Sequence, residues 1–247
     1  VGYSGVIRRT TNGGTNWTDQ TVGSADLKGV SFFGSSGTAV GNSGTILGTT
    51  NGGTNWAPQT SPTSFVLFAV SFLDASNGII AGWGEAIRTT NGGTNWTQVD
   101  LSAITSNKLF GISFRHTTNG TAVGEGGKIL RTTNGGSTWT EQTSGTTNIL
   151  YGVSFTDASN GTAVGAGGKI LKTTNGGTNW TAQTIGTEDL FAVSFTDANN
   201  GTAVGANGTI LRTTNGGTNW STQTSGTSNN LLGVSFTDAN NGTAVGI

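Results

Sequence analysis

The sequence has no cysteine, no methionine, two prolines and one histidine, and only 9% of its 247 residues are charged. Without cysteine, the chain can form neither a disulfide framework nor a thiolate metal site. One histidine, His116, cannot supply a histidine metal cluster or a Ser/His/Asp arrangement, and its position favours an exposed turn residue. We therefore expect no cofactor and no bound metal.

The formal net charge is −1, so electrostatics does not favour nucleic acid or an anionic membrane surface as a partner. The apolar stretches are far shorter than the roughly 20 residues of a membrane-spanning helix, and the sequence predicts no signal peptide. Because the chain begins inside a repeat and lacks methionine, we interpret it as a mature, clipped or engineered piece of a longer product. Its Asn, Thr, Ser and Gly content is typical of secreted or surface-exposed bacterial proteins.

The many glycines follow a period. The string Thr-Thr-Asn-Gly-Gly-x-x-Trp occurs six times, with successive copies starting 39 to 43 residues apart. The copies begin at Thr10, Thr49, Thr89, Thr132, Thr173 and Thr213. Self-similarity at this period indicates a propeller or a solenoid.

Each repeat predicts four short strands. In one copy these are residues 150–155, 162–165, 169–174 and 181–184. Residues 156–161 carry the Asp, Asn and Gly that a tight turn needs. Short strands with turn signals every 8 to 12 residues or so fit an all-β architecture.

The first strand has one bulky and one small face. Val153 and Phe155 fall on one side, and Gly152 and Ser154 on the other, because side chains alternate along a strand. A sheet of this kind can stack its large side on the small side of an identical neighbour. We therefore expect consecutive repeats to share a core, as radially arranged blades do.

The chain starts and stops at the same point of the repeat. Residues 1–5 align with residues 204–208, and residues 243–247 end at the equivalent place. One blade can therefore take two strands from about 225–247 and two from 1–21, which would hide both sheet edges. An open solenoid would carry atypical capping repeats, and the sequence has none. We predict one domain over 1–247, an all-β, six-bladed β-propeller with four antiparallel strands per blade, closed by pairing the N-terminal and C-terminal strands.

Thr-x-Asn-x-Gly-x-x-Trp matches the Asp-box pattern of Ser/Thr, Asp/Asn, Gly and Trp/Phe. With its Gly-x-Ile-Leu-Arg lead-in, the unit resembles the BNR-type repeats of the photosystem II assembly and stability-factor family over the whole chain. The resemblance implies a propeller, and a basic patch in that family is associated with protein binding. That family has seven blades, one more than the repeat count here. Related boxes occur in sialidases, xyloglucan-cleaving glycosidases and sortilin-like receptors.

We interpret the box as a structural device. Its Asn oxygen can accept backbone N–H bonds in the turn between the third and fourth strands, its Gly adopts a backbone conformation that disfavours other residues, and its Trp covers the turn as a buried apolar body. The box pairs are Asn12 and Trp17, Asn51 and Trp56, Asn91 and Trp96, Asn134 and Trp139, Asn175 and Trp180, and Asn215 and Trp220.

A basic residue precedes the Thr-Thr of most boxes, at a position that we call the basic slot. The slot residues are Arg9, Arg88, Arg131, Lys172 and Arg212, with Gly48 in the second copy. A repeated basic position in a third strand favours a hydrogen bond or ion pair between repeats over a catalytic cluster, and a partner-docking role stays open.

The sequence favours no catalytic site. A sialidase needs a tyrosine nucleophile, and neither Tyr3 nor Tyr151 lies in a nucleophile context. A glycosidase needs two carboxylates about 5–10 Å apart, and the recurring aspartates lie in one turn of each repeat, where they cap it. These aspartates are Asp74, Asp157, Asp197 and Asp238.

Departures from the repeat indicate a candidate ligand site. Trp83 is the only tryptophan outside a box, in a hairpin one residue shorter than its counterparts, and Glu85 follows it. Tyr3 and Glu125 occupy the equivalent connections of other repeats. In propellers this loop face usually binds ligands, and an exposed aromatic beside a carboxylate is a common sugar-stacking arrangement.

We therefore predict a non-catalytic binding or scaffold propeller, a module of a secreted or cell-surface bacterial protein that contacts protein or glycan. One alternative is an assembly chaperone of the photosystem II stability-factor type, and another is a carbohydrate-binding or glycoside-hydrolysing propeller. The predicted location is extracellular or on the bacterial cell surface, with the periplasm and thylakoid lumen as alternatives. No nucleic acid partner and no membrane insertion are expected.

Overall fold

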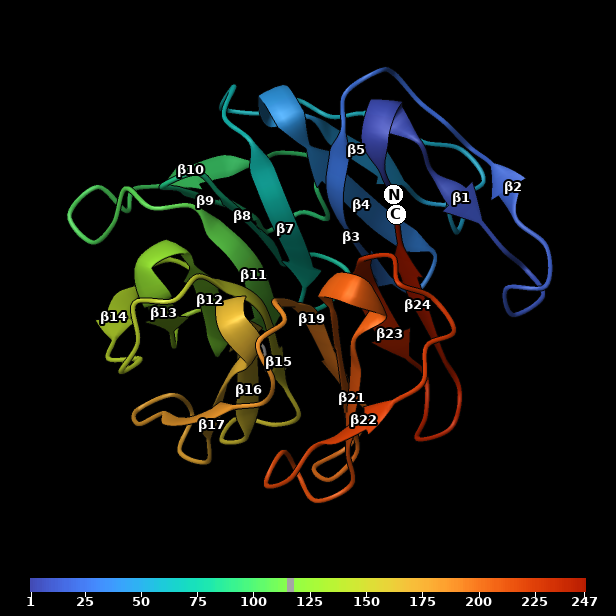
Figure 1. Ribbon diagram of the computed structural model, residues 1–247. Coiled ribbons are helices and arrows are strands. Elements are labelled where there is room, and N and C mark those ends of the chain that lie inside the picture. The colour runs from blue at the N-terminus through green and yellow to red at the C-terminus, as the bar shows by residue number, and fades with distance from the viewer. Residues whose placement is uncertain (115–117) are drawn as a thin grey trace. The chain divides into compact units, whose positions relative to one another are not determined.

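The computed structural model describes residues 1–114 and 118–247 (Figure 1). The expectation for His116 falls outside these residues. The chain divides into two compact units. The first comprises Val1–Asn119 and Thr132–Trp139, and the second comprises Gly120–Arg131 and Thr140–Ile247.

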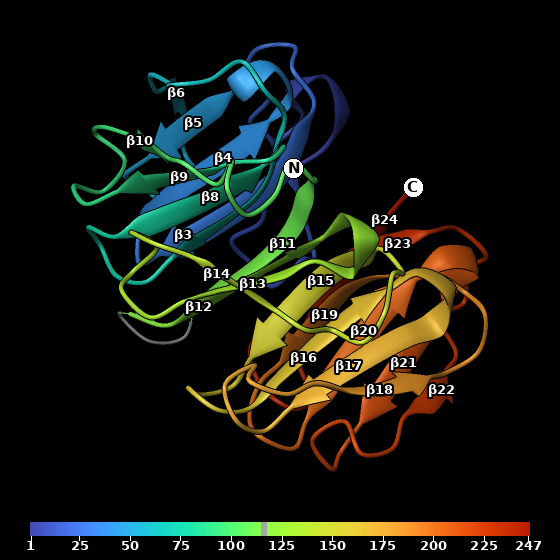
Figure 2. The ribbon, with the colours of Figure 1, turned by 90° about the vertical axis from the view of Figure 1, so that its left-hand side faces the viewer.

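One repeat of the second unit shows how the sequence forms a sheet. β15 (Leu150–Phe155), β16 (Gly161–Gly165), β17 (Lys169–Thr173) and β18 (Thr181–Thr184) pair in that order, each antiparallel to the next (Figure 2). These bounds agree with the predicted strands to within one residue. β16 is buried along its whole length, because β15 and β17 cover its edges and neighbouring sheets cover its faces.

The first unit repeats this pattern. Its strands are β1 (Arg8–Arg9), β2 (Thr18–Asp19), β3 (Leu27–Phe33), β4 (Ser36–Gly41), β5 (Ile46–Thr49), β6 (Ala57–Pro58), β7 (Leu67–Phe72), β8 (Gly78–Gly82), β9 (Ala86–Thr89), β10 (Thr97–Val99) and β11 (Leu109–Phe114). Short 3-10 turns occupy connections between second and third strands, η1 (Tyr3–Gly5) and η2 (Asn42–Gly44).

The second unit adds further strands of the same kind. They are β12 (Gly120–Gly124), β13 (Ile129–Thr132), β14 (Thr140–Gln142), β19 (Leu190–Phe195), β20 (Gly201–Gly205), β21 (Ile210–Thr213), β22 (Ser221–Gln223), β23 (Leu231–Phe236) and β24 (Gly242–Gly246). The 3-10 turns here are η3 (Glu125–Gly127), η4 (Ala166–Gly168) and η5 (Ala206–Gly208).

The strands form four-stranded sheets in sequence order. These sheets are β3 to β6, β7 to β10, β11 to β14, β15 to β18 and β19 to β22. Every strand pair with a described register is antiparallel, which confirms the all-β prediction of four antiparallel strands per repeat. β1 with β2 and β23 with β24 each form a two-stranded sheet of their own, so the predicted pairing of the two ends is not among the strand pairs of the described residues.

Consecutive sheets within a unit share a core, as the bulky and small faces predict. A Cβ on Gly152 would lie 3.1 Å from the Cα of Ala192, so the small face approaches the next sheet too closely for a larger residue. On the same face, Ser154 Oγ accepts a hydrogen bond of 3.3 Å from the Phe195 N–H of the next sheet. Burial of each large aliphatic side chain in these cores contributes about 1.5–3 kcal/mol.

Candidate functional site

The Asp-box turn holds its own polar groups. In the second copy, Thr49 Oγ1 donates to Asn51 Oδ1 over 2.9 Å and accepts the Gly53 N–H at 3.1 Å, while Asn51 Oδ1 accepts the Asn55 N–H at 3.0 Å. Gly53 has a φ of +78°, which favours glycine. The same pattern recurs in all six copies, at Asn12, Asn51, Asn91, Asn134, Asn175 and Asn215. Because these groups bond within the turn, the box acts as a structural element.

Most box tryptophans pack edge-on against a phenylalanine at the end of the first strand of the same sheet. The Phe72 and Trp96 ring centroids, for example, are 6.0 Å apart at 84°. Trp56, Trp96 and Trp139 are buried and Trp180 and Trp220 are partly buried, whereas Trp17 is 44% exposed. The expectation of burial is therefore wrong for Trp17, because its two-stranded sheet lacks the strand that supplies the phenylalanine.

Side chains of the basic slot reach the following repeat. Arg9 Nε donates to the Gly52 carbonyl over 2.7 Å, and Arg88 Nε donates to the Gly135 carbonyl over 2.8 Å. Each acceptor belongs to the box of the next repeat.

In the second unit the slot makes equivalent contacts. Lys172 Nζ donates to Thr218 Oγ1 over 3.2 Å, and Arg212 Nη2 donates to the Ala239 carbonyl over 2.8 Å. The guanidinium of Arg131 lies against Gly176. The hydrogen bonds between repeats that we expected are thus present. The basic side chains bond to backbone and threonine oxygens and do not form one basic cluster.

Trp83 lies in an exposed aromatic cluster of the first unit, which we call the Trp83 cluster and which comprises Phe65, Trp83 and Lys108. Trp83 is 48% exposed and Phe65 is 53% exposed, with ring centroids 6.4 Å apart. Lys108 Nζ lies 4.9 Å from the centroid of the Trp83 ring, within the range of a cation–π contact.

Backbone hydrogen bonds hold this cluster in place. The Trp83 N–H donates to the Val66 carbonyl over 3.2 Å, and the Gly84 N–H donates to the Asn107 carbonyl over 3.0 Å. Trp83 also pairs with Lys108 in an isolated antiparallel bridge. The shortened hairpin is thereby tied to both neighbouring loops, so the aromatic surface is preorganised.

Tyr3 forms a second aromatic and cationic cluster in the same unit. Its ring is 57% exposed, and Lys28 Nζ lies 5.1 Å from the ring centroid. Lys28 also lies 3.5 Å from Asp26 Oδ2, and Asp26 Oδ1 accepts the Ser4 N–H. Sequence reasoning missed the lysines as partners of these rings, although both lie at or near the start of a first strand, where the sequence varies between repeats.

Glu85 is buried rather than exposed beside Trp83. It is 2% exposed, Gln98 Nε2 donates to its Oε2 over 2.9 Å, and Oε1 has no hydrogen bond of good geometry within the described part of the chain. Burial raises the pKa of Glu85 and outweighs the opposing polar contacts of Thr63 and Gln98. The sugar-stacking arrangement needs an acid exposed together with Trp83, and Glu85 does not provide it.

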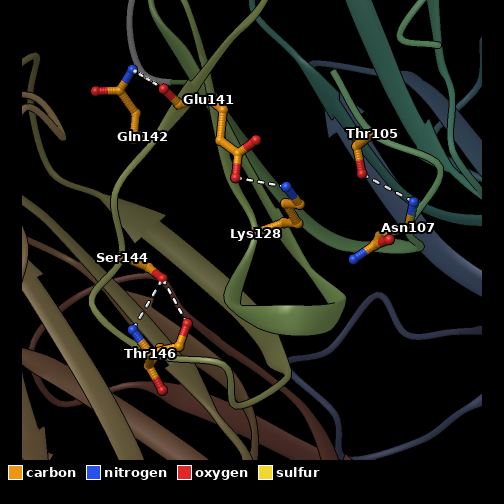
Figure 3. A network of polar contacts seen from close by, with 7 residues as sticks. All are labelled: Thr105, Asn107, Lys128, Glu141, Gln142, Ser144 and Thr146. Atoms are coloured by element: carbon orange, nitrogen blue, oxygen red, sulfur yellow. Dashed lines mark hydrogen bonds and ion pairs between the residues drawn. The ribbon is translucent and has the colours of Figure 1, made fainter. Parts of the chain in front are cut away.

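Glu125 begins η3 in the second unit and is half-buried. Contacts within the neighbouring loops hold them in place (Figure 3). Lys128 Nζ pairs with Glu141 Oε1 at 2.6 Å. Ser144 Oγ donates to the Thr146 carbonyl and accepts the Thr146 N–H. The candidate residues of the first unit therefore do not form one site. Trp83 and Glu85 share a hairpin but differ in exposure, Tyr3 has its own cluster, and Glu125 lies in the other unit.

The recurring aspartates cap their own turns. Asp157 Oδ1 accepts the Ser159 and Asn160 N–H groups at 2.7 and 2.8 Å. Hydrogen bonds from the Asn160 side chain and from these amides lower the pKa of Asp157. Within residues 1–114 and 118–247, no three His, Cys, Asp or Glu side chains gather in a way that could hold a metal ion. No helix of this part of the chain is long and apolar enough to cross a membrane.

A family model described as photosynthesis system II assembly factor YCF48 matches residues 141–222, less than half of the chain. No curated protein matches the sequence.

Solved structures of the same name share the fold. YCF48 bound to D1 peptide has a TM-score of 0.79 at 20% identity, covering 100% of this chain and 84% of that one. YCF48 from Cyanidioschyzon merolae has a TM-score of 0.82 at 22% identity, covering 100% and 87%. The GH74 enzyme of Niastella koreensis has a TM-score of 0.68 at 16% identity, covering 91% and 45%. The chain is a BNR-repeat β-propeller that resembles the photosystem II assembly factor. The findings favour the assembly-factor alternative over the predicted module of a secreted or cell-surface bacterial protein.

Proposed function

We propose that the chain is a non-catalytic propeller of the assembly-factor type that binds a peptide segment of a partner protein. The observation that carries this proposal is the Trp83 cluster, in which two exposed rings and a cation are held by backbone hydrogen bonds. Exposed aromatic side chains are the residues that most often anchor protein interfaces. The solved complex of YCF48 with a D1 peptide supports a peptide as the ligand class.

The hydrogen bonds and the burial of the acidic side chains support a non-catalytic function. The capping aspartates bond within their turns, and Glu85 is buried away from solvent. A partner from photosystem II would place the protein in the thylakoid lumen, one of the compartments that the sequence left open. A glycan ligand has no such support, since the likeness to GH74 enzymes is one of fold.

Calorimetric titration with the D1 peptide tests the proposed function. We expect saturable binding that weakens by about tenfold or more in Trp83→Ala, because loss of an aromatic anchor typically costs 2 kcal/mol or more, and about 1.4 kcal/mol is a tenfold change. Leu232→Ala, at an exposed apolar position of the second unit, is the control and should bind as the wild type does. Undiminished binding by Trp83→Ala would remove the Trp83 cluster from the site, and no binding by the wild type would reject this peptide as its ligand.

We also propose that the two end sheets are the halves of one blade, which closes a single six-bladed domain over residues 1–247. Trp17 lies in a sheet without a first strand, and Phe236 ends a first strand whose sheet has no box. In the complete sheets these two positions form an edge-to-face pair. The two half-sheets are therefore complementary in sequence.

A double-mutant cycle between Trp17 and Phe236 tests this closure. Paired rings should show a coupling free energy of unfolding of about 0.5–1.5 kcal/mol, which is typical of aromatic pairs. The Phe195 and Trp220 pair, with centroids 5.9 Å apart, is the matched positive control. A coupling of zero for Trp17 and Phe236, with normal coupling in the control, would contradict the closure.

A further inference from the structure

The basic slot is interrupted once, at Gly48, and a hollow of about 330 Å³ lies there in the first unit. Residues from two consecutive repeats line it, among them Ser36, Thr38, Phe72, Ala75 and Gly92. A smaller hollow of about 200 Å³ lies at the equivalent place beside Lys172. The hollow at the glycine slot is therefore larger than the one at the lysine slot.

The contacts of Arg212 show what a guanidinium does at this position. Its Nη1 donates to Thr202 Oγ1 over 3.3 Å, and its Nη2 donates to Asn200 Oδ1 over 3.2 Å and to the Ala239 carbonyl over 2.8 Å. Its Cζ lies 5.8 Å from the centroid of the Phe236 ring. Two side-chain oxygens, one carbonyl and one ring face thus surround the group.

The hollow at Gly48 contains the equivalents of these four partners. Thr38 stands across the strand pair from Gly48, as Thr202 stands across from Arg212. Counted along the repeat from these positions, Ser36 replaces Asn200, Ala75 replaces Ala239 and Phe72 replaces Phe236. The lining therefore has the hydrogen-bond acceptors and the aromatic ring of an arginine site, without the arginine.

The neighbouring box glycine provides a second, independent sign. Gly52 and Gly135 accept the hydrogen bonds of Arg9 and Arg88 and are partly or fully buried, and Gly176 is buried beneath Arg131. Gly92, the equivalent glycine beside Gly48, is exposed. Within the described residues, neither the Gly92 carbonyl nor the Ala75 carbonyl accepts a hydrogen bond. Two acceptors that are satisfied by arginine elsewhere remain available here.

Gln59 is the side chain that lies nearest to the slot. Its amide is in contact with the position that a Cβ of residue 48 would take, and its Oε1 accepts the indole N–H of Trp96 over 2.9 Å. This contact holds Gln59 toward the box tryptophan. The acceptors on Thr38 and on the Ala75 and Gly92 backbone are left to a ligand.

We propose that the hollow at Gly48 binds a guanidinium group supplied in trans, either by an arginine side chain of a partner polypeptide or by a small guanidine. Carbonyl and hydroxyl oxygens would accept its N–H groups, and Phe72 would offer a ring face to the cation. The site is separate from the Trp83 cluster and does not rest on the function proposed above.

Titration of the whole ¹⁵N-labelled chain with ethylguanidinium, the end of an arginine side chain, tests this site. We expect saturable amide shifts at Thr38, Ala75 and Gly92. The neutral analogue ethylurea should bind about tenfold or more weakly than ethylguanidinium, because charge-assisted hydrogen bonds are roughly twice as strong as neutral ones. Shifts that do not saturate, or that ethylurea reproduces, would overturn the proposal.

Three variants test where the guanidinium binds. Gly48→Arg should abolish the saturable shifts by filling the hollow from within. Gly48→Lys copies the slot of Lys172 and should weaken the shifts, and it serves as the second variant if the arginine side chain disturbs folding. Arg212→Gly, which empties a slot with the same hydroxyl, carbonyl and ring, should create a second site, with new shifts at Thr202 and Ala239. Binding that persists in both Gly48 variants would place the guanidinium elsewhere. A peptide with one arginine, compared with its citrulline form and with ethylguanidinium, distinguishes a polypeptide ligand from a small one.

Discussion

The Asp-box turn of the third repeat and the hairpin that precedes it show opposite treatments of polar and aromatic groups. In the box, Thr89 and Asn91 bond within the turn, and Trp96 is buried with its indole N–H bonded to Gln59. In the hairpin, Trp83 is exposed, and Glu85 is buried with an oxygen left without a good hydrogen bond. The two regions are adjacent in sequence and belong to the same sheet.

The difference separates the scaffold from the candidate binding surface. A turn whose Thr and Asn side chains bond to its own backbone can be copied six times, because these groups need no partner from another repeat. A hairpin that exposes a tryptophan and buries a carboxylate costs stability, and such local inconsistencies are typical of functional sites. We therefore expect box substitutions to change stability and hairpin substitutions to change binding.

The largest expected effect is on the box side of this comparison. Trp96→Ala should lower the free energy of unfolding by about 3–5 kcal/mol, because it removes a buried aromatic side chain and leaves a cavity. Trp83→Ala should lower it by less than about 1 kcal/mol, since the exposed ring buries less apolar surface. Urea denaturation of both variants measures the difference. Equal losses would show that the hairpin is as much a part of the scaffold as the box.

Much of this scaffold could be predicted from the sequence. The strands of residues 150–184, the polar bonds of the box and the hydrogen bonds from the basic slot follow from patterns that recur in each repeat. The strands and the slot hydrogen bonds depend on neighbours that are themselves repeats, so one copy supplies the environment of the next. Periodicity therefore carries tertiary information that a single strand pattern does not.

The candidate site was less predictable, because its features come from single positions. The placement of Trp83 depends on the connection that follows the third repeat, where Trp83 bridges to Lys108 and the Asn107 carbonyl accepts the Gly84 N–H. In the sequence that connection shows only as a longer spacing between boxes. The exposure of Trp17 likewise depends on which strands pair, and the box motif alone does not specify that.

A smaller effect tests the hairpin side of the comparison. Because burial raises the pKa of Glu85 in the folded state, its contribution to stability is complete below the unfolded pKa and is lost as pH rises through the folded pKa. Glu85→Gln removes the buried charge while keeping an oxygen that can accept from Gln98. We expect this variant to be more stable than the wild type at pH 7 by about 1 kcal/mol, with the difference vanishing near about pH 4.

Asp157→Asn is the matched control, because the pKa of the Asp157 carboxyl group shifts in the opposite direction to that of Glu85. Hydrogen bonds from Asn160 and Ser159 lower the pKa of Asp157, so its contribution is present above the unfolded pKa and is lost as pH falls through the folded pKa. The Asn variant should therefore be less stable than the wild type at neutral pH and should converge with it in acid. Urea midpoints of the three proteins from about pH 2 to pH 7 measure both trends. If the two variants deviate from the wild type with the same sign, Glu85 is not an uncompensated buried charge, and the contrast between hairpin and box would have to rest on Trp83 alone.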